Sequence, residues 1–258
     1  MPDPPVMTGG TPFPRSPLVL RLGSLLIIGG IWEVAGRTTL GERLPPLSRV
    51  ISQLVTELGT AEFWNAAAIT GTALGLGLGV SLLGGIVFGV VNGALAWLER
   101  STRVFARAMV ALPLAPMIPI LISMFGLGTS VRVAAITVFA LPIIFEYTTA
   151  GVRATDRSLT AMARVFHASR WMTYTRVILP SAAPSILAGV RLGVGRSVVG
   201  MVVAELVIVS TGLGALLRRA QALFVPEAVF AYVLVFLGVG LLLVRGIGLI
   251  EKRTVFWT

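Results

Sequence analysis

The chain lacks cysteine altogether, and it contains a single histidine, His167, and a single lysine, Lys252. Without cysteine it can hold neither a disulfide nor a thiolate metal site. The isolated histidine forms no metal-binding pattern with the scattered carboxylates. The lysine is not part of a G-x-x-x-x-G-K-[ST] sequence, so a phosphate-binding loop of that type is absent. These absences predict a chain with no metal site, no catalytic residues and no ATPase activity of its own.

Charged residues are scarce as well. They make up 12% of the 258 residues, whereas soluble domains carry about 25%. Hydrophobic residues make up 55%, and the mean hydropathy is +0.91. This composition indicates an integral membrane protein. A net charge of +10 can indicate nucleic-acid binding, but in a membrane chain it is better explained by arginines retained in cytoplasmic loops. The expected surroundings are therefore lipid, not nucleic acid.

Six apolar segments approach the roughly 20 residues that a membrane-spanning helix needs. They are Leu18–Ala35, Trp64–Leu98, Ala108–Phe125, Val131–Val152, Ser185–Val209 and Ala228–Ile250. The sequence thus predicts an all-α integral membrane protein with six transmembrane helices. Residues 1–17, rich in proline, are expected to be a disordered tail and not a signal peptide. Residues 18–62 comprise the first helix and an outer segment, residues 63–252 the core, and residues 253–258 a second tail.

An even number of spans places both termini on one side of the membrane. The arginine-rich connections, residues 99–107 and 153–176, then fall on the same side as the termini, which predicts cytoplasmic termini in a bacterial plasma membrane. On the opposite side, Leu47–Leu58 has a helical stripe of Val50, Leu54 and Leu58, which favours a helix lying on the outer surface. A plain polar loop is the alternative.

The second span is rich in glycine, which lets membrane helices approach closely. The third contains Pro113, Pro116 and Pro119, and three prolines at this spacing cannot sit in an unbroken helix. Broken backbone at membrane depth is tolerated mainly where protein or a watery cavity surrounds it. The three prolines are therefore candidates for a wall of a translocation path. A kinked packing helix is the alternative.

The longest polar, basic stretch is DRSLTAMARVFHASRWMTYTRVILP, residues 156–180. Thr155 or Asp156 can cap a helix start. Leu159, Met162, Ala163 and Phe166 then follow the i, i+3, i+4, i+7 spacing of one helix face. Such a short amphipathic helix can rest on lipid headgroups or dock into a groove of a partner.

This stretch resembles the EAA loop of ABC importer permeases, whose pattern is E-A-A, three residues, G, nine residues and I-x-L-P. The pattern falls on Ala161, Met162, Ala163, His167, Val177, Leu179 and Pro180, with its spacing intact. Ala161 replaces the usual glutamate, Met162 an alanine and His167 the glycine. The segments TAGVRATDRSL and PSILAGVRLGVGRSVVGMVVAE resemble the nitrate, sulfonate, taurine and bicarbonate group of these permeases. The resemblance extends from about Phe63 to the C-terminus.

The resemblance implies a MetI-like type I permease fold with a cytoplasmic coupling helix between the fourth and fifth spans. It implies docking to two copies of a separate ATPase, which would bind the ATP and magnesium, through Leu159, Met162, Ala163, Arg164, Phe166, His167 and Arg170. It further implies a second permease copy, forming a homodimer, and an extracytoplasmic solute-binding protein. We expect the loop to break at His167, because histidine is among the residues tolerated at positive φ, with Ser169 capping the second helix.

Glu146 and Arg191 are expected at similar depths inside their spans, since each lies seven residues from a cytoplasmic marker, Arg153 and Pro184. They can form an intramembrane ion pair that orients two helices. Alternatively, Glu146 lines the substrate path, because ionisable groups at depth face the bundle interior or water.

The expected function is import of a small solute of the nitrate, sulfonate, taurine or bicarbonate class. Some relatives carry pyrimidine-like vitamin precursors instead. An ATP-independent secondary transporter or channel, or a non-transporting membrane scaffold, are the rival classes.

Overall fold

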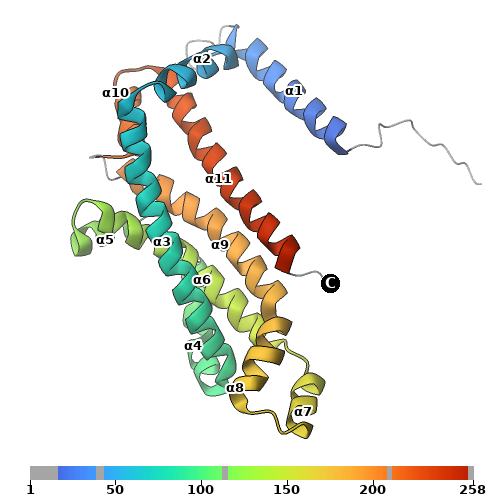
Figure 1. The fold of residues 1–258 in the computed structure, drawn as a ribbon. Helices are drawn as coiled ribbons and strands as arrows, with labels where there is room; N and C mark the ends of the chain where they lie inside the picture. The colour runs from blue at the N-terminus through green and yellow to red at the C-terminus, as the bar shows by residue number, and fades with distance from the viewer. Residues whose placement is uncertain (1–16, 39–43, 112–115, 208–210, 255–258) are drawn as a thin grey trace, which may run out of the picture.

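The structure, a computed structural model, describes residues 17–38, 44–111, 116–207 and 211–254. Throughout this part of the chain the regular elements are helices (Figure 1). They are α1 (Pro17–Gly36), α2 (Leu47–Leu58), α3 (Ala61–Ala94), α4 (Ala96–Ala111), α5 (Met117–Phe125), α6 (Thr129–Arg153), α7 (Arg157–Val165), α8 (Arg170–Thr173), the π-helical turn η1 (Tyr174–Ile178), α9 (Leu179–Val207), α10 (Leu213–Ala222) and α11 (Pro226–Thr254).

Five helical stretches in the described chain are long and apolar enough to cross a membrane: Val19–Gly36, Ala61–Ala94, Thr129–Arg153, Arg170–Val207 and Pro226–Leu249. The third predicted span, Ala108–Phe125, is not one helix. Its beginning belongs to α4, residues 112–115 lie outside the described residues, and α5 is only nine residues long, or about 14 Å. Pro116 occupies the N-cap and Pro119 the first turn of α5, where a missing N–H leaves no helical hydrogen bond unmade.

Residues 99–107, predicted as a short basic turn, are also helical and form much of α4. The charged side chains are compatible with a helix here because apolar residues are interspersed among them. Two of these apolar residues, Val104 and Phe105, are exposed. The helix predicted at Leu47–Leu58 is confirmed with the same bounds as α2, and its place on the outer surface stays a prediction.

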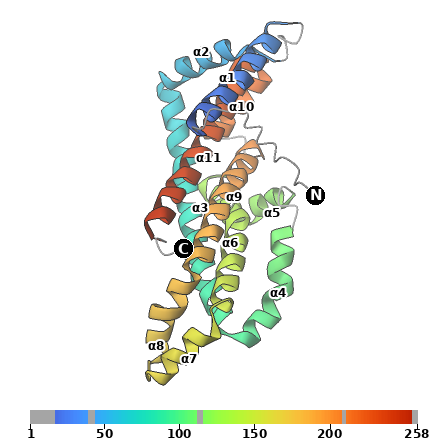
Figure 2. The ribbon, with the colours of Figure 1, turned by 90° about the vertical axis from the view of Figure 1, so that its right-hand side faces the viewer.

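The centre of the bundle is α6, which packs between α3 and α9 (Figures 1 and 2). Glycine makes this close packing possible on both sides. A Cβ at Gly85 of α3 would lie 2.7 Å from Cβ of Ile144, and one at Gly193 of α9 would lie 2.5 Å from Cγ1 of the same residue. Ile144 is fully buried between them. The prediction that small residues bring the spans together is confirmed.

Helix α1 stands away from the bundle and joins it through α2 (Figure 1). The corner between them is held by two side chains of α1. Trp32 Nε1 donates to the carbonyl of Pro45 at 3.0 Å, and the Glu33 carboxylate accepts from the backbone N–H of Ser48 at 2.9 Å. Because Pro46 cannot cap α2 with its side chain, Glu33 of the neighbouring helix supplies the acceptor.

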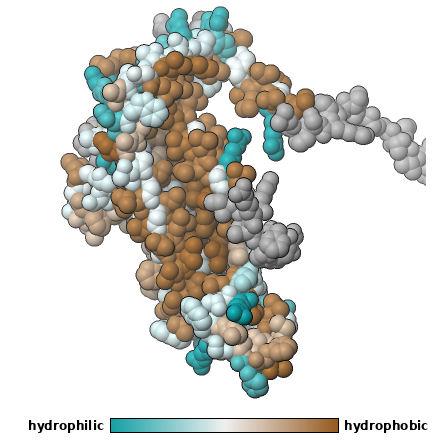
Figure 3. Space-filling model, in the orientation of Figure 1, coloured by the Kyte–Doolittle hydropathy of each residue, from teal (hydrophilic) through white to brown (hydrophobic). Residues whose placement is uncertain are grey.

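Helix α11 packs on α9 and on the outer helices α2 and α10. Tyr232 of α11 donates to Glu57 Oε2 of α2 at 2.7 Å. In the space-filling view a hydrophobic band covers the middle of the visible face, and hydrophilic side chains gather at its two ends (Figure 3). The band corresponds to the spans α3, α9 and α11, so the two ends of the bundle project into water.

Candidate functional site

The loop between α6 and α9 forms one end of the molecule, opposite α2 and α10 (Figure 1). Its first helix, α7, begins where Asp156 Oδ1 accepts from the backbone N–H of Ser158 at 2.8 Å. These hydrogen bonds with Ser158 hold the pKa of Asp156 below its usual range. The cap predicted from the sequence is therefore formed by Asp156, and it fixes the first turn of α7 immediately after the end of α6.

The loop breaks at His167, as predicted. His167 has a φ of 52°, its N–H donates to the carbonyl of Arg164 at 3.0 Å, and the N–H of Ala168 donates to the carbonyl of Ala163 at 2.9 Å. This pair of bonds is the Schellman arrangement that usually ends a helix at glycine. Ser169 then caps α8 by accepting from the N–H of Met172 at 3.2 Å. Histidine thus takes the place of glycine without removing the turn.

This geometry predicts that His167→Gly preserves the loop, because glycine reaches the same backbone region without strain. His167→Val should disrupt it, because a β-branched residue is disfavoured at positive φ. Co-purification of the ATPase with each variant measures the effect. We expect the wild-type ratio for His167→Gly and a reduced ratio for His167→Val, and equal ratios for the two variants would contradict the role assigned to the turn.

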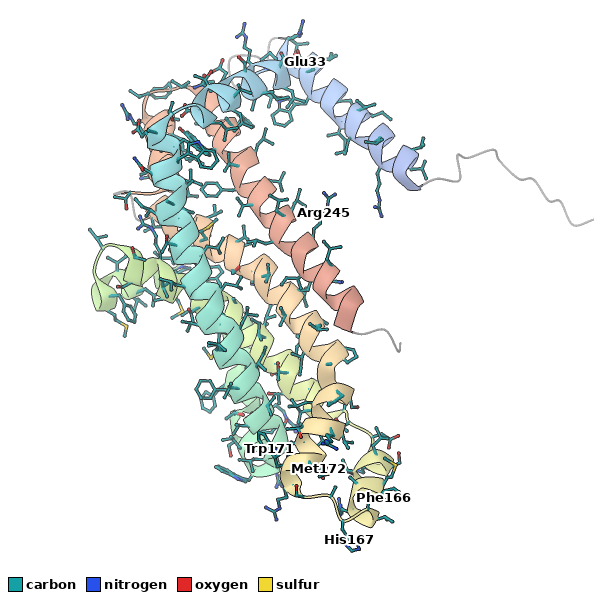
Figure 4. All side chains as sticks on the ribbon, viewed as in Figure 1. Glu33, Phe166, His167, Trp171, Met172 and Arg245 are labelled. Atoms are coloured by element: carbon teal, nitrogen blue, oxygen red, sulfur yellow. The ribbon has the colours of Figure 1, made fainter. Side chains whose placement is uncertain are left out.

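Apolar side chains are exposed along this loop (Figure 4). Of the predicted docking residues, Leu159 is 38% exposed, Met162 49% and Phe166 77%. Three residues that were not predicted are exposed as well: Val165 at 75%, Trp171 at 78% and Met172 at 42%. Val165 could have been predicted from helical spacing if a wider apolar stripe had been allowed. Trp171 and Met172 could not, because the turn at His167 brings them to the same end of the molecule. We call these six side chains the loop patch.

Ala163 was predicted to face a partner, but its side chain is not exposed. It is 4% exposed and therefore buried within the chain, because α7 folds back onto η1. Arg164 and Arg170, also predicted to dock, are exposed beside the loop patch. The loop therefore exposes both apolar and cationic side chains.

A buried carboxylate ties the start of the loop to α4. Glu99 pairs with Arg103 of its own helix, Nε to Oε1 at 2.7 Å, and with Arg153 at the end of α6, Nη1 to Oε2 at 3.3 Å. The hydrogen bonds from Arg103 hold the pKa of Glu99 below its usual range, so the carboxylate keeps its charge at neutral pH. Displacement of the loop would therefore act on α4 as well as on α6 and α9.

The residues predicted for the translocation path are dispersed. Pro113 lies outside the described residues, Pro116 and Pro119 are exposed at the start of α5, and Glu146 is partly exposed on α6. Arg191 lies against α11, with Nη2 3.8 Å from the Cβ position of Gly248. The ion pair between Glu146 and Arg191 stays a prediction.

A second polar cluster, missed by the sequence reasoning, lies near α10, at the end of the bundle opposite the loop. Glu205 of α9 and Arg132 of α6 are 0% and 1% exposed and approach to 3.6 Å. Glu205 Oε1 accepts from Thr70 Oγ1 of α3 at 2.6 Å, and Oε2 accepts from the N–H of Gly214 in α10 at 2.8 Å. Glu205 therefore joins three spans to α10, whose N-cap, Gly212, has no side chain to offer.

Comparison with known proteins decides the family. Residues 81–256 match the model of the family described as "Binding-protein-dependent transport system inner membrane component". The chain belongs to this family. It is the permease subunit of an ABC importer and a multi-pass protein of the inner membrane.

Among the relatives of this ABC permease, the taurine transport system permease protein TauC of Escherichia coli is 27% identical over 93% of this chain and 90% of its own length. The putative aliphatic sulfonates transport permease protein SsuC of Bacillus subtilis is 31% identical over 90% and 84%. The formylaminopyrimidine transport permease protein ThiX of Halalkalibacterium halodurans is 26% identical over 90% and 93%.

Two solved ABC transporters share the fold of the permease. The MetNI methionine transporter in an inward-facing conformation matches with a TM-score of 0.59 at 18% identity, over 80% of this chain and 97% of that one. A bacterial alginate transporter in complex with a pentasaccharide-bound periplasmic protein matches with a TM-score of 0.59 at 16% identity, over 92% and 95%. The predicted MetI-like ABC permease fold is confirmed.

Proposed function

We propose that this permease imports a small sulfonate- or taurine-like solute as a homodimer, with two ATPase subunits at the α7–α8 loop and a solute-binding protein at the opposite end. The observation that carries the proposal is the loop patch, a set of exposed apolar side chains at one end of the bundle, on a loop that also exposes Arg164 and Arg170. Exposed apolar surface of this kind marks a site of protein association. The names of the relatives TauC and SsuC supply the solute class.

The proposed mechanism uses rigid-body movement. ATP-driven closure of the two ATPases would draw the two loops together. Each loop continues into α9 through η1 and is attached to α6 at Arg153, so its movement would reach the spans and switch the path between inward-open and outward-open states. ATP and magnesium would be bound by the ATPase subunits and not by this chain.

The proposed topology has six crossings, with α4 and α5 together forming a broken third crossing and both termini in the cytoplasm. Arginine is concentrated at the end that carries α7, which supports this orientation.

Because the chain has no native cysteine, a single cysteine replacing the exposed Ala161 should react only from the cytoplasm. A cysteine replacing Ser52 of α2 should react only from outside, and labelling in the reverse sense would refute the orientation.

Uptake by the reconstituted complex tests the function. The permease would be placed in vesicles with its ATPase and solute-binding protein, and uptake of radiolabelled taurine and methanesulfonate would be measured. We expect uptake that stops when ATP is withheld while ion gradients remain intact. Uptake driven by an ion gradient without ATP would indicate a secondary transporter instead. Uptake of formylaminopyrimidine but of neither sulfonate would select the class named for the relative ThiX.

A further inference from the structure

Arg196 lies near the middle of the span formed by α9. Two packing contacts fix its depth: the Cβ position of Gly200 lies 2.8 Å from Phe139 of α6, and that of Gly193 lies 2.5 Å from Ile144. Arg196 falls between these two levels, opposite the centre of α6. In a bilayer centred at this level the hydrocarbon would extend about 15 Å in either direction, which is farther than an arginine side chain can reach to bring its charge to the headgroups.

The side chain of Arg196 is nevertheless exposed, and it forms no hydrogen bond or ion pair with any residue that the structure describes. Its neighbours along one stripe of α9, Leu192 and Val199, are 45% and 50% exposed. A charge at this depth is costly in lipid, so such arginines face a bundle interior or a water-filled cavity. The Arg196 guanidinium therefore needs a polar environment that a lipid-facing surface would not provide.

The position of the stripe identifies that environment. Farther outward the same face of α9 carries Val203, which packs against the α5 cluster that includes Ile118 and Leu121. Helix α5 follows the proline-rich break, and broken backbone is tolerated at membrane depth beside protein or a watery cavity. The stripe therefore runs toward α5, where a watery cavity would accommodate both the arginine and the proline-rich backbone. Arg245 of α11 is also exposed, but it lies nearer to an end of its helix and points toward α1 (Figure 4).

We infer that the Arg196 stripe lines the aqueous translocation path and that the Arg196 guanidinium forms a transient binding site for an anionic group of the solute. The chemistry fits a sulfonate or another small oxyanion, because guanidinium recognises planar or tetrahedral oxyanions with two parallel hydrogen bonds. This inference rests on the proposed transport function, and it assigns to the permease itself a part of the selection for anions.

Cysteine labelling of the permease in membranes tests the inference without the ATPase. Val199→Cys, with Arg196 intact, would be treated with a sulfonate-bearing and a trimethylammonium-bearing methanethiosulfonate, both membrane-impermeant. A unit positive charge about 6 Å away in water should speed modification by the sulfonate reagent roughly threefold and slow modification by the trimethylammonium reagent roughly threefold. The ratio of the two modification rates should therefore exceed that of a free thiol by about tenfold. Adding Arg196→Gln should abolish the preference, and Arg196→Lys should keep it.

Leu26→Cys on α1, where the side chain is 76% exposed, is the control for an apolar surface and should not react. Failure of Val199→Cys to react from either side would overturn the inference, since the stripe would then be covered by lipid or protein. A reaction with no charge preference, or with a preference unchanged by Arg196→Gln, would overturn it as well.

In the reconstituted complex, Arg196→Gln should lower methanesulfonate uptake at least about tenfold. A wild-type complex that moves no solute would refute the proposed function, while the labelling result would still decide the role of Arg196.

Discussion

Replacing Phe166 by aspartate should abolish assembly with the ATPase while leaving the permease folded in the membrane. Phe166 is 77% exposed at the end of α7, so the substitution costs little in the isolated chain. In the complex it would bury a carboxylate in an apolar groove without a partner, which is strongly unfavourable. Loss of a central anchor of this kind costs about 3 kcal/mol, which weakens association roughly a hundredfold. Co-purification of the ATPase with tagged permease measures the effect.

Ala161→Glu is the matched control, because it adds the same charge to the exposed polar side of the same helix. The EAA pattern has glutamate at this position, so assembly should survive. Ala163→Asp is a poorer test, because Ala163 is buried within the chain and the charge would disturb the loop itself. ATPase recovered at the wild-type ratio with the Phe166→Asp permease would show that the loop patch is not the docking surface.

The second large effect is a loss of stability, expected when Gly85 is replaced in the contact between α3 and α6. A Cβ there would lie 2.7 Å from Cβ and 2.8 Å from Cγ2 of the fully buried Ile144. Gly85→Leu would force the two central spans apart, and overpacking of this degree costs about 3 kcal/mol. The thermal unfolding midpoint in detergent and the yield of monodisperse protein should both fall sharply.

Gly75 provides the comparison, since it lies on the same helix and no heavy atom stands within 4 Å of its Cβ position. Gly75→Leu should leave the unfolding midpoint near that of the wild type. If both leucine variants are equally stable, the tight approach of α3 to α6 is not what stabilises the bundle.

Local patterns determined much of the fold. Five of the six apolar segments became long helices, the stripe of Val50, Leu54 and Leu58 became α2, and the caps at Asp156 and Ser169 formed where helix chemistry placed them. The turn at His167 was also predictable, because the end of a short helix depends on the backbone preferences of a few adjacent residues. The prolines predicted a break in the third span, but the sequence pattern could not show that the two parts form separate helices.

Other features depend on residues far apart in the chain. Glu205 reads as a polar residue near the end of a span, yet it accepts from Thr70, 135 residues away, and from the first turn of α10. Ala163 belongs to the apolar stripe of α7, yet the folding of α7 onto η1 turns it inward while Val165 and Trp171 face outward. Glu146 and Arg191 lie seven residues from Arg153 and Pro184, respectively, but the sequence could not show that Arg191 lies against Gly248 of α11.

The sequence by itself determined that this chain is a membrane permease of the ABC importer type, because hydropathy, helix caps and the EAA spacing are properties of short, contiguous stretches. The tertiary structure decided which side chains form the loop patch, which carboxylates hold the outer and inner ends together, and which face of α9 presents Arg196. These outcomes follow from helix rotation and from the glycine-permitted approach of α3 and α9 to α6, and both are set by packing between segments distant in sequence.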